Sequence, residues 1–172
     1  MRKIATVFSE SLGFEVDFLS FNENKVEGFK GQHGYNKTDF PSETISYLTN
    51  THTDSTVVSH VEGSKFDKVY ELEKLNSSSP YDMFLSGPSA IVTLKNENAA
   101  TDKELVIFRD SYSCNLAPLL TGVYKEITLI DLRYVMSVLI DSYVKIENKD
   151  ILFLYNDRVV NNGEMLKVLI SE

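Results

Sequence analysis

Residues 104–130 read ELVIFRDSYSCNLAPLLTGVYKEITLI, and this stretch decides the fold class. Two short apolar runs, at 105–108 and 127–130, stand on either side of a segment that can form a helix, and a third run follows at 151–155. Short runs of this kind are typical of strands buried on both faces of a parallel sheet. Their alternation with helical segments predicts an α/β fold with right-handed crossovers.

The spacing of apolar residues predicts the other elements. Helices are expected at 4–12, 116–123, 135–146 and 165–170. Extended segments are expected at 14–21 and 90–94, with a strand near a sheet edge within 53–61. The helix at 116–123 would begin near Asn115 and carry Pro118 in its first turn, where proline is tolerated.

Length and composition indicate one globular domain. The chain has 172 residues, of which 42% are hydrophobic and 24% charged, and its net charge is -8. Such an acidic surface repels phosphate backbones, so nucleic-acid binding is not expected. A single cysteine, Cys114, excludes an internal disulfide framework and a cysteine-based zinc site. No apolar run approaches the roughly 18 residues that a membrane span needs.

The chain divides by composition into two parts. Residues 22–80 are rich in polar and turn-forming residues, and we interpret them as an irregular, β-rich insertion. Residues 81–172 carry the strand–helix–strand core. The fold class expected for the whole is α/β, with a parallel sheet and this insertion in its first half.

Polar residues follow each of the three apolar runs, where ligands bind in parallel sheets. The clusters are Arg109-Asp110-Ser111, then Asp131 with Arg133, then Asn156-Asp157. Because the carboxyl ends of parallel strands meet at one edge, these clusters are predicted to converge. They form the candidate site.

Ser111 is the candidate nucleophile. A serine between a buried strand and a helix can use free helix N–H groups, its own included, to stabilise an oxyanion. The alternative is that Ser111 or Ser113 only caps the helix, which spacing alone favours. Asn156 can donate its amide to an oxyanion or be a turn residue. Asp131 and Arg133 are expected to form a structural ion pair beneath the site.

A serine nucleophile needs a base, usually a histidine. The three histidines are His33, His52 and His60, all in the irregular first half, and none follows Ser111. A loop histidine is more often a solvated surface residue than a catalyst. The three also lack metal-ligand spacing, so no metal and no cofactor are predicted.

Several segments, in order and spacing, resemble the DHHW family of bacterial proteins, which is similar to SGNH hydrolases and to the acetyltransferase-like proteins of alginate export. They are Asp82-Met83-Phe84-Leu85-Ser86-Gly87-Pro88, Arg109-Asp110-Ser111-Tyr112-Ser113, Leu116-Ala117-Pro118-Leu119-Leu120, Asp131-Leu132-Arg133-Tyr134 and the run from Ile151 to Asn156. The closest agreement covers residues 81–162.

The resemblance implies an SGNH- or flavodoxin-like α/β/α sandwich with a parallel sheet, in which Ser111 matches the family's serine. Asn156-Asp157 looks similar to the Gly-x-Asn-Asp block, which contributes an oxyanion donor, although the glycine is absent. The family's catalytic Asp and His belong to an Asp-His-His-Trp signature upstream of the serine. This chain has neither that motif nor any tryptophan. The resemblance therefore leads us to expect either a domain that is incomplete at the amino terminus, with a missing segment or a partner chain, or a family member that has lost catalysis.

Two functions are compared on this basis. The first is a serine esterase or O-acyltransferase acting on cell-surface carbohydrate, nearly inactive as given because the Asp/His dyad is absent. The second is a non-catalytic carbohydrate-binding or assembly module on the same fold, favoured by nine tyrosines that could stack on sugars. A nucleotide or receiver domain is disfavoured, because no glycine-rich phosphate loop follows any strand. The resemblance also implies an extracytoplasmic location.

Overall fold

The computed structural model describes residues 2–34, 36–66 and 68–169. Its strands are β1 (Asn22–Phe29), β2 (Glu43–Thr49), β3 (Val57–His60), β4 (Lys65–Phe66), β5 (Ile91–Lys95), β6 (Glu104–Arg109), β7 (Glu126–Ile130) and β8 (Asp150–Leu154). Its α-helices are α1 (Arg2–Leu12), α2 (Gly31–Gly34), α3 (Thr51–Ser55), α4 (Ser113–Leu120) and α5 (Asp157–Asn161). The 3-10 helices are η1 (Phe18–Ser20), η2 (Leu72–Asn76), η3 (Pro80–Met83), η4 (Ser137–Ser142) and η5 (Gly163–Met165).

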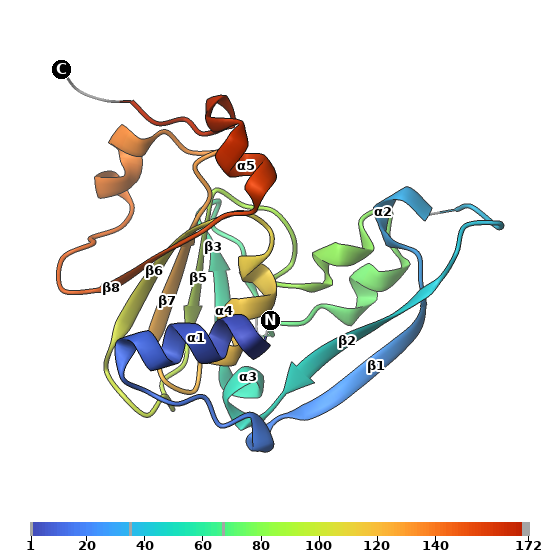
Figure 1. The fold of residues 1–172 in the computed structure, drawn as a ribbon, viewed down its shortest axis with the longest axis horizontal. Coiled ribbons are helices and arrows are strands. Elements are labelled where there is room, and N and C mark those ends of the chain that lie inside the picture. Colours follow the sequence, from blue (N-terminus) through green and yellow to red (C-terminus); the bar gives the residue numbers. More distant parts are fainter. Residues whose placement is uncertain (1, 35, 67, 170–172) are drawn as a thin grey trace.

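The main sheet has six strands in the order β4-β3-β5-β7-β6-β8 (Figure 1). The three apolar runs of the sequence form β7, β6 and β8, which are neighbours and run parallel, as predicted. The prediction of a wholly parallel sheet is wrong, because β5 pairs with β7, and β3 with β5, in antiparallel fashion. The connection from β5 to β6 covers only 96–103, shorter than the dozen or so residues that a parallel crossover requires.

Strand β6 is buried on both faces, which explains its uninterrupted apolar sequence. Leu105 and Ile107 point into one hydrophobic cluster, and Val106 and Phe108 into a second on the opposite face. Residues two apart in a strand share a face, so this alternation follows directly from the pleat. The sheet therefore separates two cores.

Helices α1 and α4 cover one face of the sheet (Figure 1). Helix α1 agrees with the prediction for residues 4–12. Helix α4 begins at Ser113, earlier than predicted, so Pro118 lies inside the helix and not in its first turn. The earlier start has a local cause, because the Ser113 hydroxyl donates to the Asp110 carbonyl at 3.0 Å and stabilises the first turn.

The other face is covered by residues 132–146, and this segment is not the predicted α-helix. Only η4 is helical there, and Val138 is 56% exposed although it belongs to the apolar pattern. The backbone N–H of Ser137 donates to the Lys167 carbonyl at 3.0 Å, so tertiary hydrogen bonds replace the helical ones. The expected helical layer is thus found on one face of the sheet.

Two further predictions differ from the structure, and the prediction of a strand near a sheet edge is confirmed. Residues 14–21 contain η1 instead of an extended segment, because Asp17 caps the turn through the Leu19 N–H. The closing helix predicted at 165–170 is replaced by η5, which ends at Met165, and Ile170 lies outside the described residues. Within 53–61 the strand is β3, next to the edge strand β4, and α3 occupies the beginning of the range.

Residues 22–80 hold the two-stranded antiparallel sheet β1-β2, which extends away from the main sheet (Figure 1). They also contribute β3 and β4 to the main sheet, as well as α2, α3 and η2. The division of the chain into an insertion at 22–80 and a core at 81–172 stays a prediction.

Candidate functional site

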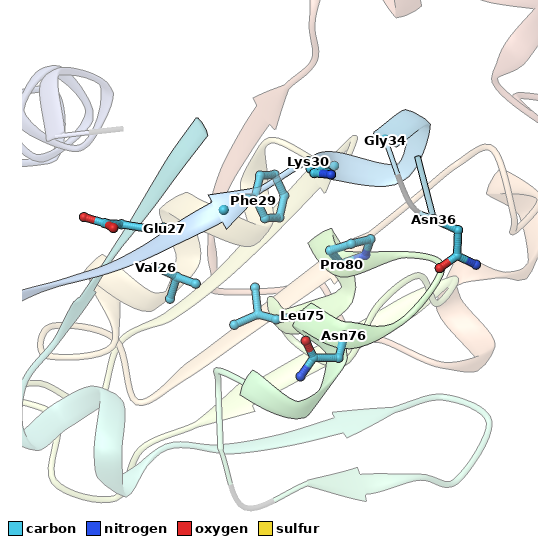
Figure 2. A pocket seen from close by; sticks show the side chains of 11 residues that line it. Val26, Glu27, Phe29, Lys30, Gly34, Asn36, Leu75, Asn76 and Pro80 are labelled. Atoms are coloured by element: carbon cyan, nitrogen blue, oxygen red, sulfur yellow. The ribbon is translucent and has the colours of Figure 1, made fainter. Parts of the chain in front are cut away.

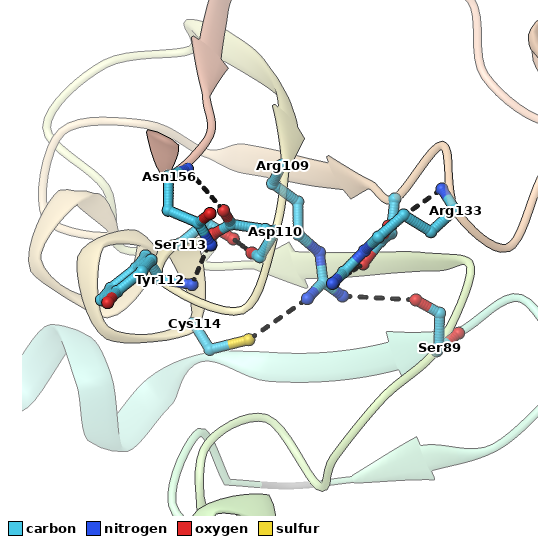
Figure 3. Close-up of polar contacts among 9 residues, drawn as sticks. Ser89, Arg109, Asp110, Tyr112, Ser113, Cys114, Arg133 and Asn156 are labelled. Carbon is cyan, nitrogen blue, oxygen red and sulfur yellow. Dashed lines mark hydrogen bonds and ion pairs between the residues drawn. The ribbon is translucent and has the colours of Figure 1, made fainter. Parts of the chain in front are cut away.

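The carboxyl ends of β7, β6 and β8 meet at one edge of the sheet and bring the predicted polar clusters together. Asp131 directly follows β7, Asp110 and Ser111 follow β6, and Asn156 lies just beyond β8. The Asn156 backbone N–H donates to Asp110 Oδ2 at 2.6 Å, which ties the ends of β6 and β8 to each other (Figure 3).

Asp110 organises this edge from a fully buried position. Its Oδ1 accepts a hydrogen bond from the Tyr112 N–H at 2.9 Å, while its Oδ2 accepts the one from Asn156. Both oxygens are therefore committed to backbone donors. Asp110 fixes the turn that contains Ser111.

Ser111 is exposed in the turn between β6 and α4. Among the described residues, no hydrogen bond involves its hydroxyl or its N–H, and only its carbonyl is engaged, by the Cys114 N–H at 3.2 Å. Tyr112 occupies the N-cap position of α4 without a side-chain cap. The structure thus does not use Ser111 or Ser113 as a capping side chain, and the Ser111 hydroxyl is available for chemistry.

A cavity of about 230 Å³ adjoins this serine. Its lining includes four of the predicted site residues: Arg109, Ser111, Asp131 and Arg133. Asn156 and Asp157 are not among the lining residues. The cavity is smaller than the roughly 300–1,000 Å³ typical of sites for drug-sized ligands, so it suits a short acyl group or a single small ring.

The remaining lining residues were not predicted as site residues, although some lie in stretches that carry the family resemblance. Tyr81, Asp82, Gly87, Cys114 and Tyr134 all face the cavity. The signal for Asp82, Gly87 and Tyr134 was present in the segments 82–88 and 131–134, but a role for a single side chain could not be read from them without knowing how the loops fold.

Asp131 and Arg133 form the expected ion pair. Arg133 Nε and Nη2 donate to the two carboxylate oxygens at 2.9 and 2.6 Å, and the Arg133 N–H adds a third bond at 3.1 Å. The hydrogen bonds to Asp131, which is fully buried, raise the pKa of the Arg133 guanidinium. Bidentate geometry of this kind holds both side chains in one arrangement. The pair forms a rigid wall of the cavity.

Asn156 is the N-cap of α5. Its side-chain oxygen accepts a hydrogen bond from the Val159 N–H at 2.9 Å. This oxygen therefore has a structural role, as the turn-residue alternative for Asn156 predicts. Its amide Nδ2 makes no hydrogen bond within the described part of the chain. Asp157 is exposed, and its carboxylate accepts from the neighbouring Arg158 N–H at 2.8 Å.

None of the three histidines lines the serine cavity. His52 Nδ1 lies 3.2 Å from the Asn96 amide, and His60 Nε2 lies 2.8 Å from the Leu85 carbonyl. His33 is exposed in α2. Cys114 does face the cavity, but burial raises the pKa of its thiol and keeps it neutral, which makes it a poor competitor as nucleophile.

The loop on the far side of the cavity has an unusual backbone. Leu85, Ser86 and Gly87 have φ values of 53, 60 and 97°, three successive residues in the left-handed region. Only glycine adopts this region freely, and other residues pay about 1–2 kcal/mol each. A Cβ at position 87 would lie 2.9 Å from Asp82 Cγ, so glycine is also required by space. Such strain is often found at functional sites.

Buried polar atoms without a partner also gather around the cavity. Within the described residues these are Ser86 Oγ, Arg109 Nε, Asn115 Oδ1 and Tyr155 Oη. Arg109 lines the cavity, Ser86 precedes the lining residue Gly87, and the Asn115 amide donates to the hydroxyl of Tyr81. Native interiors leave few polar atoms unsatisfied, and each one calls for a cause such as a water or a ligand. Their grouping supports a functional cavity.

A second cavity, of about 360 Å³, lies between the end of β1, α2 and the η2–η3 loop (Figure 2). Its ionisable side chains are Glu27 and Lys30. The Lys30 ammonium is held by the carbonyl of Lys37 at 2.6 Å. No serine, threonine or cysteine is among the described residues that line this cavity, so the cavity beside Ser111 remains the candidate site.

The described residues contain no group of three or more His, Cys, Asp or Glu side chains arranged to hold a metal ion. Among the same residues, no helix combines the length and the apolar character needed to cross a bilayer.

Solved structures with this arrangement exist. A DHHW family protein from Eubacterium siraeum DSM 15702 superposes with a TM-score of 0.71 and 23% identity, covering 98% of this chain and 59% of that one. Bacillus cereus PatB1, in one structure with a sulfonyl adduct and in one without, gives TM-scores of 0.67 and 0.66 at 16% and 17% identity. The match covers 91% of this chain and 56–57% of PatB1.

These proteins share one fold. The chain spans less than three fifths of the length of the solved structures that it matches. No family model and no curated protein matches the sequence.

Proposed function

We propose that this protein is an SGNH-like serine esterase or O-acyltransferase domain in which Ser111 accepts the acyl group. The observation that carries the proposal is an exposed serine with a free hydroxyl and a free N–H, placed at the start of α4 and on the wall of a small polar cavity. The resemblance to the DHHW family and the fold shared with one of its members support the same reading.

In the proposed reaction the Ser111 oxygen attacks the ester carbonyl and forms a bond to the acyl carbon. The alcohol leaves with the proton that the serine loses, and water or a sugar hydroxyl then removes the acyl group from the serine. The Ser111 N–H, which makes no hydrogen bond with a described residue, would stabilise the oxyanion. The acceptor, by resemblance, is cell-surface carbohydrate outside the cytoplasm.

The described residues around Ser111 include no histidine that could act as a general base. The Ser111 hydroxyl therefore stays neutral and loses its proton only to solvent. An oxyanion hole and binding alone give about 10³–10⁴-fold over water. We therefore infer slow acyl transfer by the described residues alone, and faster transfer when an external base is present.

Labelling with phenylmethanesulfonyl fluoride, followed by peptide mass spectrometry, tests the nucleophile. The PatB1 structure with a sulfonyl adduct makes this class of reagent the natural choice. We expect slow modification at Ser111, acceleration by added imidazole, and loss of labelling in Ser111→Ala. Ser78→Ala, at another exposed loop serine, should label like the wild type. Equal labelling of Ser111→Ala and wild type, with or without imidazole, would remove the proposal.

The alternative is a non-catalytic carbohydrate-binding module on the same fold. It is favoured by Tyr134, which is 54% exposed at the cavity with the Arg133 guanidinium against its ring at 5.6 Å. An exposed aromatic face beside polar groups suits a sugar ring. Calorimetry with bacterial polysaccharides, combined with the labelling experiment, separates the two, because a binding module has a polysaccharide affinity that is lost in Tyr134→Ala while its Ser111 takes no sulfonyl label.

A further inference from the structure

Arg109 is a buried cation without an anionic partner. Its side chain is 2% exposed, and no carboxylate of the described residues lies within ion-pair distance of it. Its Nη1 contacts the Cys114 sulfur at 3.4 Å, its Nη2 donates to the Ser89 carbonyl at 3.3 Å, and its Nε has no partner (Figure 3). Every acceptor around this guanidinium is therefore neutral.

Such an arrangement is unfavourable without a further partner. Transferring an ion out of water costs several kcal/mol unless an opposite charge and hydrogen bonds compensate. A thiol sulfur is only a weak acceptor. The neighbouring carboxylates are already committed, because Asp131 is held bidentately by Arg133 and Asp110 by two backbone N–H groups.

The guanidinium belongs to the serine cavity. Arg109 is the last residue of β6, and Ser111 follows it in the turn before α4. Both line the cavity of about 230 Å³. A group that enters the cavity beside Ser111 therefore comes next to an uncompensated positive charge.

We propose that the cavity beside Ser111 binds a carboxylate, which pairs with the buried guanidinium of Arg109. The proposal rests on the function proposed above and specifies the ligand of the same site. The carboxylate has two possible sources with the same chemistry: the acid released when the acyl-serine is hydrolysed, or a carboxylate carried by the sugar substrate. The flat guanidinium matches a carboxylate in shape and number of donors.

One cavity residue opposes this ligand. Asp82 faces the same space, and its carboxylate makes no hydrogen bond or ion pair with a described residue. Arg133 does not offset this charge, because Asp131 already neutralises it. Removing the Asp82 charge should therefore strengthen carboxylate binding. This effect is opposite to the weaker binding expected when the Arg109 charge is removed.

The experiment is an NMR titration of the ¹⁵N-labelled full chain, following the arginine Nε–H signals. The Arg109 signal is identified as the one missing from Arg109→Lys. Acetate and D-glucuronate are the probes, and acetamide and D-glucose are their uncharged counterparts. We expect the Arg109 signal to shift with a carboxylate, with a Kd on the order of 1 mM because acetate has only four heavy atoms. Neither uncharged counterpart should move it.

Two variants then test whether the charges of Asp82 and Arg109 govern the affinity for the carboxylate. Asp82→Asn should bind about threefold more tightly, because a like charge is removed, and Arg109→Met at least about tenfold more weakly. Should Arg109→Met fail to fold, the shift of the wild-type Arg109 signal still decides the question. Tighter binding of acetate would identify the acid released from the acyl-serine as the source of the carboxylate. Tighter binding of glucuronate would identify a carboxylate on the sugar substrate as the source.

The outcome is separate from that of the labelling experiment. Ser111→Ala should bind the carboxylate like the wild type, since the hydroxyl is not the anion partner. Labelling of Ser111 without any carboxylate-dependent shift at Arg109 would overturn this inference alone. An Arg109→Met protein that is folded and binds acetate as tightly as the wild type would overturn it as well.

Discussion

At the residue scale, the edge of the sheet depends on one carboxylate. Asp110 joins the turn after β6 to the turn after β8 through the N–H groups of Tyr112 and Asn156. In the sequence it is one of several acidic residues near strand ends, and it could be taken as a catalytic group. Its burial and its two backbone donors indicate a structural role, in which it fixes the turn that contains Ser111.

Replacing Asp110 tests this role. Asp110→Ala leaves two backbone N–H groups without their acceptor, and hydrogen bonds to a charged group contribute about 1.5–3 kcal/mol each. We expect the free energy of unfolding to fall by about 3 kcal/mol in urea denaturation, with a smaller loss for Asp110→Asn. Asp141→Ala, an exposed acidic residue of η4, is the matched control and should stay within about 0.5 kcal/mol of the wild type. Equal effects at positions 110 and 141 would contradict the assignment.

At the scale of elements, apolar runs and apolar periodicity differ in what they predict. The runs at 105–108, 127–130 and 151–155 became β6, β7 and β8, because a strand with two covered faces tolerates few polar residues. The periodic pattern at 135–146 did not become an α-helix. A helix of this length is marginal alone and needs a face to pack on, and here only some of the apolar positions reach the sheet.

The position of a strand within the sheet determines how much the free energy of unfolding falls when one of its side chains is truncated. Ile107 of the interior strand β6 is fully buried between Leu129 of β7 and Leu152 of β8, whereas Ile151 on the edge strand β8 is 47% exposed. Ile107→Ala should therefore lower the free energy of unfolding by about 2–5 kcal/mol, the usual range for a buried isoleucine. Ile151→Ala should cost under about 1 kcal/mol, measured by the same urea denaturation. A comparable loss for both would mean that the edge of the sheet is covered.

At the scale of the whole molecule, the sheet has one helical face and one face covered by irregular segments. The aromatic residues lie mostly in these two cores, and burial raises the pKa of several tyrosine hydroxyls above the usual 10. They are Tyr70, Tyr81, Tyr124 and Tyr155, the last with its pKa raised to about 12.

This predicts a loss of stability at alkaline pH. A group whose pKa is raised by folding favours the native state below the pKa of the unfolded chain, and that contribution is lost as pH rises towards the folded value. The unfolding midpoint in urea should therefore be constant up to about pH 10 and fall between pH 10 and 12. Tyr155→Phe, which removes a buried hydroxyl without a partner, should make the fall shallower. A midpoint that stays constant through pH 12 would argue against buried tyrosines.

The sequence by itself determined the three parallel strands, the helix at the amino terminus, and the meeting of Arg109, Ser111 and Asp131 at one edge, because burial on both faces dictates residue type within a strand. Only the tertiary structure decided the direction of β5, the irregular cover over the second face and the second wall of the cavity, where Asp82 and Gly87 meet residues from distant strands. These features depend on contacts between segments far apart in the chain, and a local pattern of residues does not encode which loops will face each other.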